Sequence, residues 1–282
     1  MAFINCNGKI VEDSTPIIDA QNRGFKYGDG LFETFKFKNN QLILLDEHLA
    51  RLWNGMRLFE FQIPKLFNPD FLESQILQLI QKNKLTLARI RLTVYRGPGS
   101  LFDPLHHHPQ FIIETGDLPE NNGQLNINGL HCCIYRDAFK IIDTFSNCKH
   151  NNYLPYMMGA LYAKKEKCND AIILNQHKNI CDSSIANIFI IKNESIYTPS
   201  LKEGCIAGIM RQQIIKELNL LNYSVNEKTI DEAELMDADE VFLTNSIFNI
   251  KWVKSINEKK YENRIIQTIY QELVKTNSPI FC

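Results

Sequence analysis

Short runs of alternating hydrophobic and polar residues recur through residues 1–115 of the chain. Two stretches break this alternation with apolar residues at helical spacing. One starts at Asp46, a predicted N-cap, and continues through Leu49, Leu52 and Met56, and the other is NPDFLESQILQLIQK. The alternating runs predict strands, with a hairpin across Asn39-Asn40: FINCNGKIV, LFETFKF, QLILL, LARIRLTVYR and QFIIET. We therefore expect residues 1–115 to form a small N-terminal α+β domain.

A stretch without periodicity, GDLPENNGQ at residues 116–124, predicts a linker because it combines Gly, Pro, Asn and acidic residues. The rest of the chain alternates strand-like and helix-like segments. The predicted strands are LNINGLHCCIYR, DAIILN, a hairpin of IANIFII and SIYTP, and DEVFLT, and the predicted helices are 152–167, 208–220 and IIQTIYQELVK. Residues 125–282 should form a larger C-terminal domain, which makes the fold class α/β (α+β) with two domains.

The composition and charge of the chain argue against several classes of function. The chain has 282 residues, 44% of them hydrophobic, which is enough to bury a core without a disulfide or a metal. Its 31 basic and 32 acidic residues show no run of one sign, so we expect no nucleic-acid partner. No apolar stretch reaches the roughly 18 residues of a membrane span, and eight cysteines without CxxC pairs favour reduced thiols in the cytoplasm. We expect no metal site, since His106–His108 is a tract in a Pro-flanked loop.

Lys149 is the first candidate for chemistry. It stands between a cysteine and a polar run, just before the predicted helix at 152–167. A lysine is a strong nucleophile only as the free amine, which proteins obtain by burial or by nearby cations. Taken alone, a loop lysine is most simply a solvent-facing one, so neighbouring motifs must decide its role.

Four other features resemble parts of a cofactor site. Glycines in GCIAGIMRQQII precede a predicted helix, whose N-terminal N–H groups can bind phosphate. The strand end FLTNS offers hydroxyls, and Arg51 lies off the apolar stripe of its helix. Asp182 can face a protonated ring nitrogen. Taken singly, the glycines are most simply a turn, Arg51 a solvated arginine and Asp182 part of an Asx turn. Taken together, an amine, a phosphate cradle and a carboxylate suit pyridoxal phosphate.

Motifs in a recognisable order connect these features. They are NRGFKYGDGLFETF, HLARL, KHNNYL, DAIILN, DSSIANIFIIKNESIYTPSLKEGCIAGIMRQ and DEVFLTNS. The chain resembles a fold-type IV pyridoxal-phosphate enzyme of the class-IV aminotransferase family. This family includes branched-chain and D-amino acid aminotransferases and 4-amino-4-deoxychorismate lyases. The resemblance implies a D-amino acid aminotransferase-like fold, pyridoxal 5'-phosphate as cofactor, a small-molecule amino substrate and a homodimer.

The resemblance also assigns roles to residues. Lys149 forms the Schiff base with the cofactor and moves the proton at the substrate's alpha carbon. Asp182 stands where the family normally has glutamate opposite the pyridine nitrogen. The phosphate ligands would be Arg51, the backbone of Ile209 and Met210, and the hydroxyl of Ser246. The substrate-binding residues would be Tyr27, Phe32 and Arg96.

The same resemblance favours one reaction without excluding others. Thr34 occupies a position where branched-chain aminotransferases usually have glycine, and its hydroxyl can relay a proton in an elimination. This favours a lyase that converts 4-amino-4-deoxychorismate to p-aminobenzoate and pyruvate in folate synthesis. Against it, Leu101 replaces a lyase arginine, so another cation must bind the carboxylate: Arg89, Arg91 or Arg136. An aminotransferase acting on branched-chain or D-amino acids with a 2-oxo acid, and a non-catalytic fold relative, remain alternatives.

Overall fold

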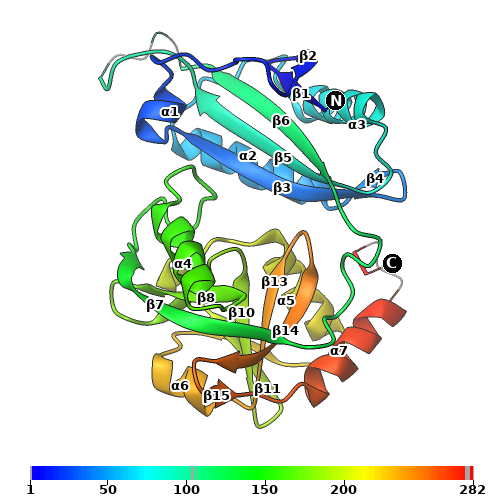
Figure 1. Ribbon diagram of the computed structural model, residues 1–282, viewed down its shortest axis with the longest axis vertical. Coiled ribbons are helices and arrows are strands. Elements are labelled where there is room, and N and C mark those ends of the chain that lie inside the picture. The colour runs from blue at the N-terminus through cyan, green and yellow to red at the C-terminus, as the bar shows by residue number, and fades with distance from the viewer. Residues whose placement is uncertain (1, 103–104, 106, 277–279, 282) are drawn as a thin grey trace. The chain divides into compact units, whose positions relative to one another are not determined.

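The chain forms two compact units. The computed structural model describes residues 2–102, 105, 107–276 and 280–281 (Figure 1). One unit contains Met1–Asn122 and Cys148–Asn152, and the other contains Gly123–Asn147 and Tyr153–Cys282. The division after Asn122 falls in the stretch predicted as a linker, although strand β6 extends to Asp117. The segment that carries Lys149 belongs to the N-terminal unit.

The N-terminal unit is built on an antiparallel sheet of six strands in the order β2-β1-β6-β5-β3-β4. The strands are β1 (Phe3–Cys6), β2 (Lys9–Glu12), β3 (Gly30–Lys38), β4 (Gln41–Leu42), β5 (Ala88–Arg96) and β6 (Pro109–Asp117). The helices are α1 (Arg23–Tyr27), α2 (Leu45–Leu58) and α3 (Pro69–Asn83). This confirms the mixed helix and strand content that the sequence predicts for this part.

Helices α2 and α3 pack on one face of this sheet (Figure 1). Leu52 and Met56 of α2 and Ile76 of α3 are buried there against Phe35 of β3. Strand residues alternate between faces, so Leu31, Glu33 and Phe35 face the helices and every second residue between them faces the other way. Burial of this apolar layer, at about 25 cal/mol per Å² of apolar surface, stabilises the unit.

Two local predictions in this unit are wrong. Asp46 is not the N-cap of α2, because the helix begins at Leu45 after Leu44, which has a left-handed φ of 56° and makes no side-chain cap. Asp46 lies in the first turn instead, where its charge suits the helix dipole. The run FINCNGKIV is not one strand but the hairpin β1-β2. Asn7 and Gly8 both have positive φ, as a tight two-residue hairpin turn requires.

The C-terminal unit is built on a mixed sheet of nine strands in the order β12-β11-β10-β13-β14-β7-β8-β9, with β15 paired to β14. The strands are β7 (Leu130–Lys140), β8 (Asp170–Asn175), β9 (Ile180–Ser183), β10 (Asn187–Lys192), β11 (Ser195–Pro199), β12 (Val225–Lys228), β13 (Glu240–Asn245), β14 (Asn249–Ile256) and β15 (Lys259–Lys260). The helices are α4 (Leu154–Lys165), the 3-10 helix η1 (Leu201–Glu203), α5 (Ile209–Leu220), α6 (Glu232–Asp237) and α7 (Arg264–Lys275).

At least two clusters of buried side chains among the described residues stabilise this unit. Ile172 and Val253 belong to the larger cluster, and Tyr156 of α4 packs with Ile173 in the smaller one. Adjacent residues of β8 thus serve different clusters, as strand alternation requires. The predicted strand LNINGLHCCIYR is shorter at its start, since β7 begins only at Leu130. Among the described residues, we find no helix whose length and apolar character would let it cross a membrane.

Candidate active site

Backbone pairing holds the segment around Lys149 against strand β3. The Phe32 N–H donates to the Lys149 carbonyl at 2.9 Å, and the Asn151 N–H donates to the Gly30 carbonyl at 2.9 Å. A Cβ on Gly28, whose φ is +66°, would lie 2.3 Å from Oδ1 of Asn152, so this approach requires glycine. Lys149 is therefore a half-buried residue fixed by the sheet.

The Lys149 side chain lies against an aromatic ring. Its Nζ is 4.4 Å from the centroid of the Phe32 ring. The Cζ of Arg91 is 3.9 Å from the same centroid. Thr34 lies directly opposite Arg91 in the register of β3 and β5. Lys149, Phe32, Thr34 and Arg91 are thus brought together on the face of the sheet opposite to α2 and α3.

On the helix-covered face, Arg51 is fixed by a buried carboxylate. Its Nε donates to Oε1 of Glu33 at 2.8 Å and its Nη2 donates to Oε2 at 2.6 Å. Nδ1 of His48 lies 2.6 Å from the same Oε2. Burial alone would raise the pKa of Glu33, but Arg51 and the hydrogen bond with His48 outweigh it and lower the pKa to about 2. Burial is also the largest cause that lowers the pKa of His48.

This arrangement predicts an acid-sensitive contribution to stability. Because folding lowers the pKa of Glu33 from 4.5 to about 2, its contribution is complete above pH 4.5 and is lost as the pH falls toward 2. We expect Glu33→Gln to lower the free energy of unfolding by about 3 kcal/mol at pH 7. Urea unfolding at several pH values should show this difference shrinking toward pH 3. A difference that stays constant with pH would contradict the assignment.

Two predicted substrate residues lie elsewhere in the N-terminal unit. Tyr27 ends helix α1 and is 36% exposed. Arg96 is buried at the end of β5, where Nη1 lies 3.5 Å from Oδ2 of Asp29 and Nη2 donates to the Phe59 carbonyl. The same Oδ2 of Asp29 also accepts a hydrogen bond from Nε of Arg23 at 2.8 Å, so one carboxylate is shared by two guanidinium groups. The role of Arg96 in substrate binding stays a prediction.

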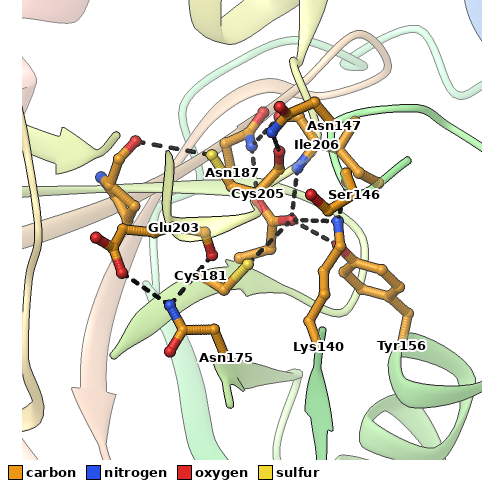
Figure 2. A network of polar contacts seen from close by, with 12 residues as sticks. Lys140, Ser146, Asn147, Tyr156, Asn175, Cys181, Asn187, Glu203, Cys205 and Ile206 are labelled. Carbon is orange, nitrogen blue, oxygen red and sulfur yellow. Dashed lines mark hydrogen bonds and ion pairs between the residues drawn. The ribbon is translucent and has the colours of Figure 1, made fainter. Parts of the chain in front are cut away.

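In the C-terminal unit, Asp182 of β9 is the centre of a polar network. Figure 2 shows this network with Tyr156, Asn187 and Ile206 labelled. Its Oδ1 accepts a hydrogen bond from Nδ2 of Asn187 at 2.7 Å. Its Oδ2 accepts from the Tyr156 hydroxyl at 2.7 Å and from the Ile206 N–H at 3.0 Å. Burial raises the pKa of Asp182, and the Lys140 ammonium is the largest opposing cause. The carboxylate is fully buried but well supplied with donors.

Helix α5 begins at the site predicted for phosphate. Its N-cap, Gly208, makes no side-chain cap, and the first turn contains no acidic residue. The N–H groups of Ile209 and Met210 lie in that turn, where the helix dipole favours an anion. A Cβ on Gly208 would come within 1.9 Å of Oδ1 of Asn187, so only glycine fits.

The end of β13 contributes hydroxyls. Thr244 is buried, and within the described part of the chain its Oγ1 has no hydrogen-bond partner. Ser246 follows β13 and is partly exposed. An orphaned buried hydroxyl, an uncapped helix N-terminus and a buried carboxylate are the groups that a phosphorylated pyridine would require. The residues of the C-terminal unit therefore fit pyridoxal phosphate.

Sequence reasoning missed several of these residues. Glu33 and His48 lie inside motifs that the sequence analysis quoted, but nothing in the sequence pairs them. Tyr156, seven positions after Lys149, reads as part of an apolar helix. His106 of the histidine tract lies outside the described residues, and no cluster of three His, Cys, Asp or Glu side chains suited to a metal occurs among those described.

Comparison with known proteins points to the same family of enzymes. Residues 30–256 match the family described as amino-transferase class IV. A putative branched-chain-amino-acid aminotransferase of Methanocaldococcus jannaschii is 26% identical over 96% of this chain and 93% of its own. A D-alanine aminotransferase of Bacillus licheniformis is 30% identical over 89% and 87%. The crystal structure of a putative 4-amino-4-deoxychorismate lyase from Legionella pneumophila has a TM-score of 0.83 and 26% identity, covering 93% and 96%.

The chain belongs to the class IV aminotransferase family. It is an enzyme of this pyridoxal-phosphate-dependent class, with the two-domain α/β fold of its members. This confirms the resemblance and the fold class that the sequence predicts. Relatives named as lyases and as aminotransferases are both present, so the family alone does not choose the reaction.

Proposed function

We propose that this protein is a pyridoxal-phosphate-dependent lyase that converts 4-amino-4-deoxychorismate to p-aminobenzoate and pyruvate. The observation that carries the proposal is the amine of Lys149, on a segment paired with β3 and beside Phe32, on the same face of the sheet as the hydroxyl-bearing Thr34. Relatives named as lyases are consistent with this reaction, and relatives named as aminotransferases keep the second candidate open. Cofactor attachment at Lys149 is part of the same proposal.

The cofactor, when bound, supplies an electron sink for the bond that breaks at the substrate's amino-bearing carbon. The N–H groups at the start of α5 and the Ser246 hydroxyl would hold the phosphate group, and Arg51, which Glu33 holds in its own unit, stays a predicted ligand. Asp182 would accept a hydrogen bond from the ring nitrogen. Lys149 would take the proton from the amino-bearing carbon while the enolpyruvyl C–O bond breaks and the ring becomes aromatic. Thr34 would relay a proton to the leaving enolpyruvate, which becomes pyruvate.

Arg91 is the residue we propose for the substrate carboxylate. Its guanidinium lies against Phe32, and its pairing with Glu114 is a loose 3.9 Å contact between partly exposed groups. Such a pair is worth little, so a substrate carboxylate can compete for the arginine. The other two candidates for binding the carboxylate are less suited, because both side chains are exposed. Arg136 is paired with Glu232, and Arg89 lies on the same face of the sheet as Arg91.

An aminotransferase is the second candidate, because Leu101 replaces the lyase arginine and relatives include a D-alanine aminotransferase. Purified holoenzyme given 4-amino-4-deoxychorismate should produce p-aminobenzoate fluorescence. Amino transfer from D-alanine or a branched-chain amino acid to a 2-oxo acid should be slower. Transfer without p-aminobenzoate would reverse the choice.

Thr34 provides the matched variants for this assay. Thr34→Val keeps the shape but removes the hydroxyl, and it should slow p-aminobenzoate formation by about a hundredfold while leaving any amino transfer unchanged. Thr34→Ser should keep most of the lyase rate. Equal loss of p-aminobenzoate formation and amino transfer in Thr34→Val would contradict the proposed role of Thr34 as a proton relay.

The proposal includes a homodimer in the cytoplasm. Helix α4 buries Tyr156, Gly159 and Ala163 on one side. Its other side exposes a second apolar stripe, Leu154, Met157, Met158 and Leu161. A helix that is apolar on both sides is typical of one covered on both sides, which supports a partner subunit. The seven described cysteines are free thiols, which supports a reducing compartment.

A further inference from the structure

A second lysine, Lys140, is buried in the C-terminal unit. It is the last residue of β7 and is 6% exposed. Its Nζ donates to the Ser146 carbonyl at 2.6 Å and lies 3.9 Å from Oδ2 of Asp182. It also lies 5.1 Å from the centroid of the Tyr156 ring (Figure 2). A buried ammonium this close to a buried carboxylate makes a pair in which each ion compensates the other.

The donors around Asp182 come from different elements. Tyr156 belongs to the first turn of α4, Asn187 begins β10, and Ile206 precedes α5. Together they fix the orientation of the carboxylate. A carboxylate has about four acceptor positions, and both positions on Oδ2 are taken by Tyr156 and the Ile206 N–H. Oδ1, which accepts one bond from Asn187, can accept one more.

The phenol and thiol groups near Asp182 are neutral at neutral pH, whereas the Glu203 carboxylate is ionised. Burial raises the pKa of Tyr156 and of Cys181, whose Sγ lies 4.0 Å from Oδ2. Burial also raises the pKa of Cys205, on the segment before α5, to about 12. Glu203 of η1 has its own donors, from Asn175, Asn179 and Thr229. Lys140 therefore supplies the positive charge that compensates this carboxylate.

We propose that Lys140 and Tyr156 are positioning residues for Asp182. Lys140 keeps the carboxylate ionised, and Tyr156 holds Oδ2, so that Oδ1 is presented to the ring nitrogen of the cofactor. This rests on the proposed binding of pyridoxal phosphate. It also explains how an aspartate can serve where the family normally has glutamate. The shorter side chain is held in one orientation by residues of three elements and by a dedicated cation.

The inference is tested first in the apoprotein, without any cofactor. The carboxyl carbon of Asp182 is followed by 13C NMR between pH 4 and 9 and is assigned by its disappearance in Asp182→Asn. Without Lys140, an uncompensated buried carboxylate takes up a proton more readily. Lys140→Met should therefore raise the titration midpoint of Asp182 by at least about one unit, a tenfold change in proton affinity. Lys140→Arg should stay near the wild-type midpoint.

Matched controls separate positioning from general damage. Lys228→Met removes a lysine that also pairs with a carboxylate, Glu234, and lies 4.5 Å from the Tyr197 ring, but is remote from Asp182 by its contacts. It should leave the Asp182 midpoint unchanged. Tyr156→Phe removes one donor and should raise the midpoint less than Lys140→Met. An identical Asp182 midpoint in wild type and Lys140→Met would overturn the inference. If Lys140→Met does not fold, an Asp182 midpoint that is unchanged in Tyr156→Phe would overturn it instead.

The second readout is the pH dependence of pyridoxal phosphate binding, measured by absorbance titration. Lys140→Met should bind the cofactor at least about tenfold more weakly at pH 6 and recover affinity as the pH rises, because the protonated carboxyl cannot accept the ring N–H. Affinity lost equally at all pH values would overturn the inference. If wild type binds no pyridoxal phosphate at all, the proposed function fails, whereas the NMR result still decides whether Lys140 controls the charge of Asp182.

Discussion

Replacement of Lys149 by alanine should give a protein that no longer holds pyridoxal phosphate covalently. Backbone pairing with β3 fixes the segment that carries Lys149, and the amine lies beside Phe32, so we expect no other lysine to take its place. Because one residue serves both as the point of attachment and as the base, turnover should fall by at least about 10²–10⁴-fold.

The measurement is direct. Holoenzyme is treated with borohydride and digested, and the peptides are mapped for the reduced cofactor adduct. Wild type should carry the adduct on Lys149, and Lys149→Ala should carry none and show no visible absorbance band after desalting. Lys164→Ala, which removes an exposed lysine of α4, is the control and should behave as wild type. An adduct on any other lysine of the wild-type protein would refute the assignment.

Elements with strong local signals were predictable from the sequence. Helix α3 is an example, since Asn68 caps it, Pro69 opens it, and Leu72, Ile76 and Leu79 form its buried stripe. Each of these signals lies within the helix or beside it. The hairpin β10-β11 is similar, because its turn residues follow directly on an apolar strand.

Elements decided by distant partners were not predictable in the same way. Strand β14 joins β13 to the parallel strand β7, whose sequence lies more than a hundred residues earlier. Its alternation between apolar and charged residues is weak evidence without that neighbour. The start of α2 likewise depends on the left-handed turn at Leu44, which a capping rule based on Asp46 cannot detect.

The candidate site shows the same distinction. Lys149 and Asp182 stand in motifs whose order identifies the family, so the sequence alone could select them. Glu33 and Lys140 could not be selected, because each acquires its role only when folding brings it to Arg51 or to Asp182. A buried charge is recognised by its partner, and the partner is a property of the fold.

Gly208→Ala should damage both the stability of the C-terminal unit and cofactor binding. The backbone of Gly208, at φ −68° and ψ 132°, would accept alanine, so the expected cost is steric. The new Cβ would come within 1.9 Å of Oδ1 of Asn187. Asn187 would have to move, and its Nδ2 hydrogen bonds to Asp182, at 2.7 Å, and to the Ile206 carbonyl, at 2.9 Å, would be lost. We expect the free energy of unfolding to fall by about 3 kcal/mol.

Urea unfolding of the apoprotein and titration with pyridoxal phosphate measure the two effects, and affinity should fall at least about tenfold because the first turn of α5 and Asp182 are both disturbed. Gly116→Ala is the matched control, since its Cβ would meet only Nη2 of Arg89, at 3.8 Å. In an Asn187→Ala background, Gly208→Ala should cost much less, because the clashing amide is gone. Equal costs in both backgrounds would show that the contact between Gly208 and Asn187 is not what requires glycine at the start of α5.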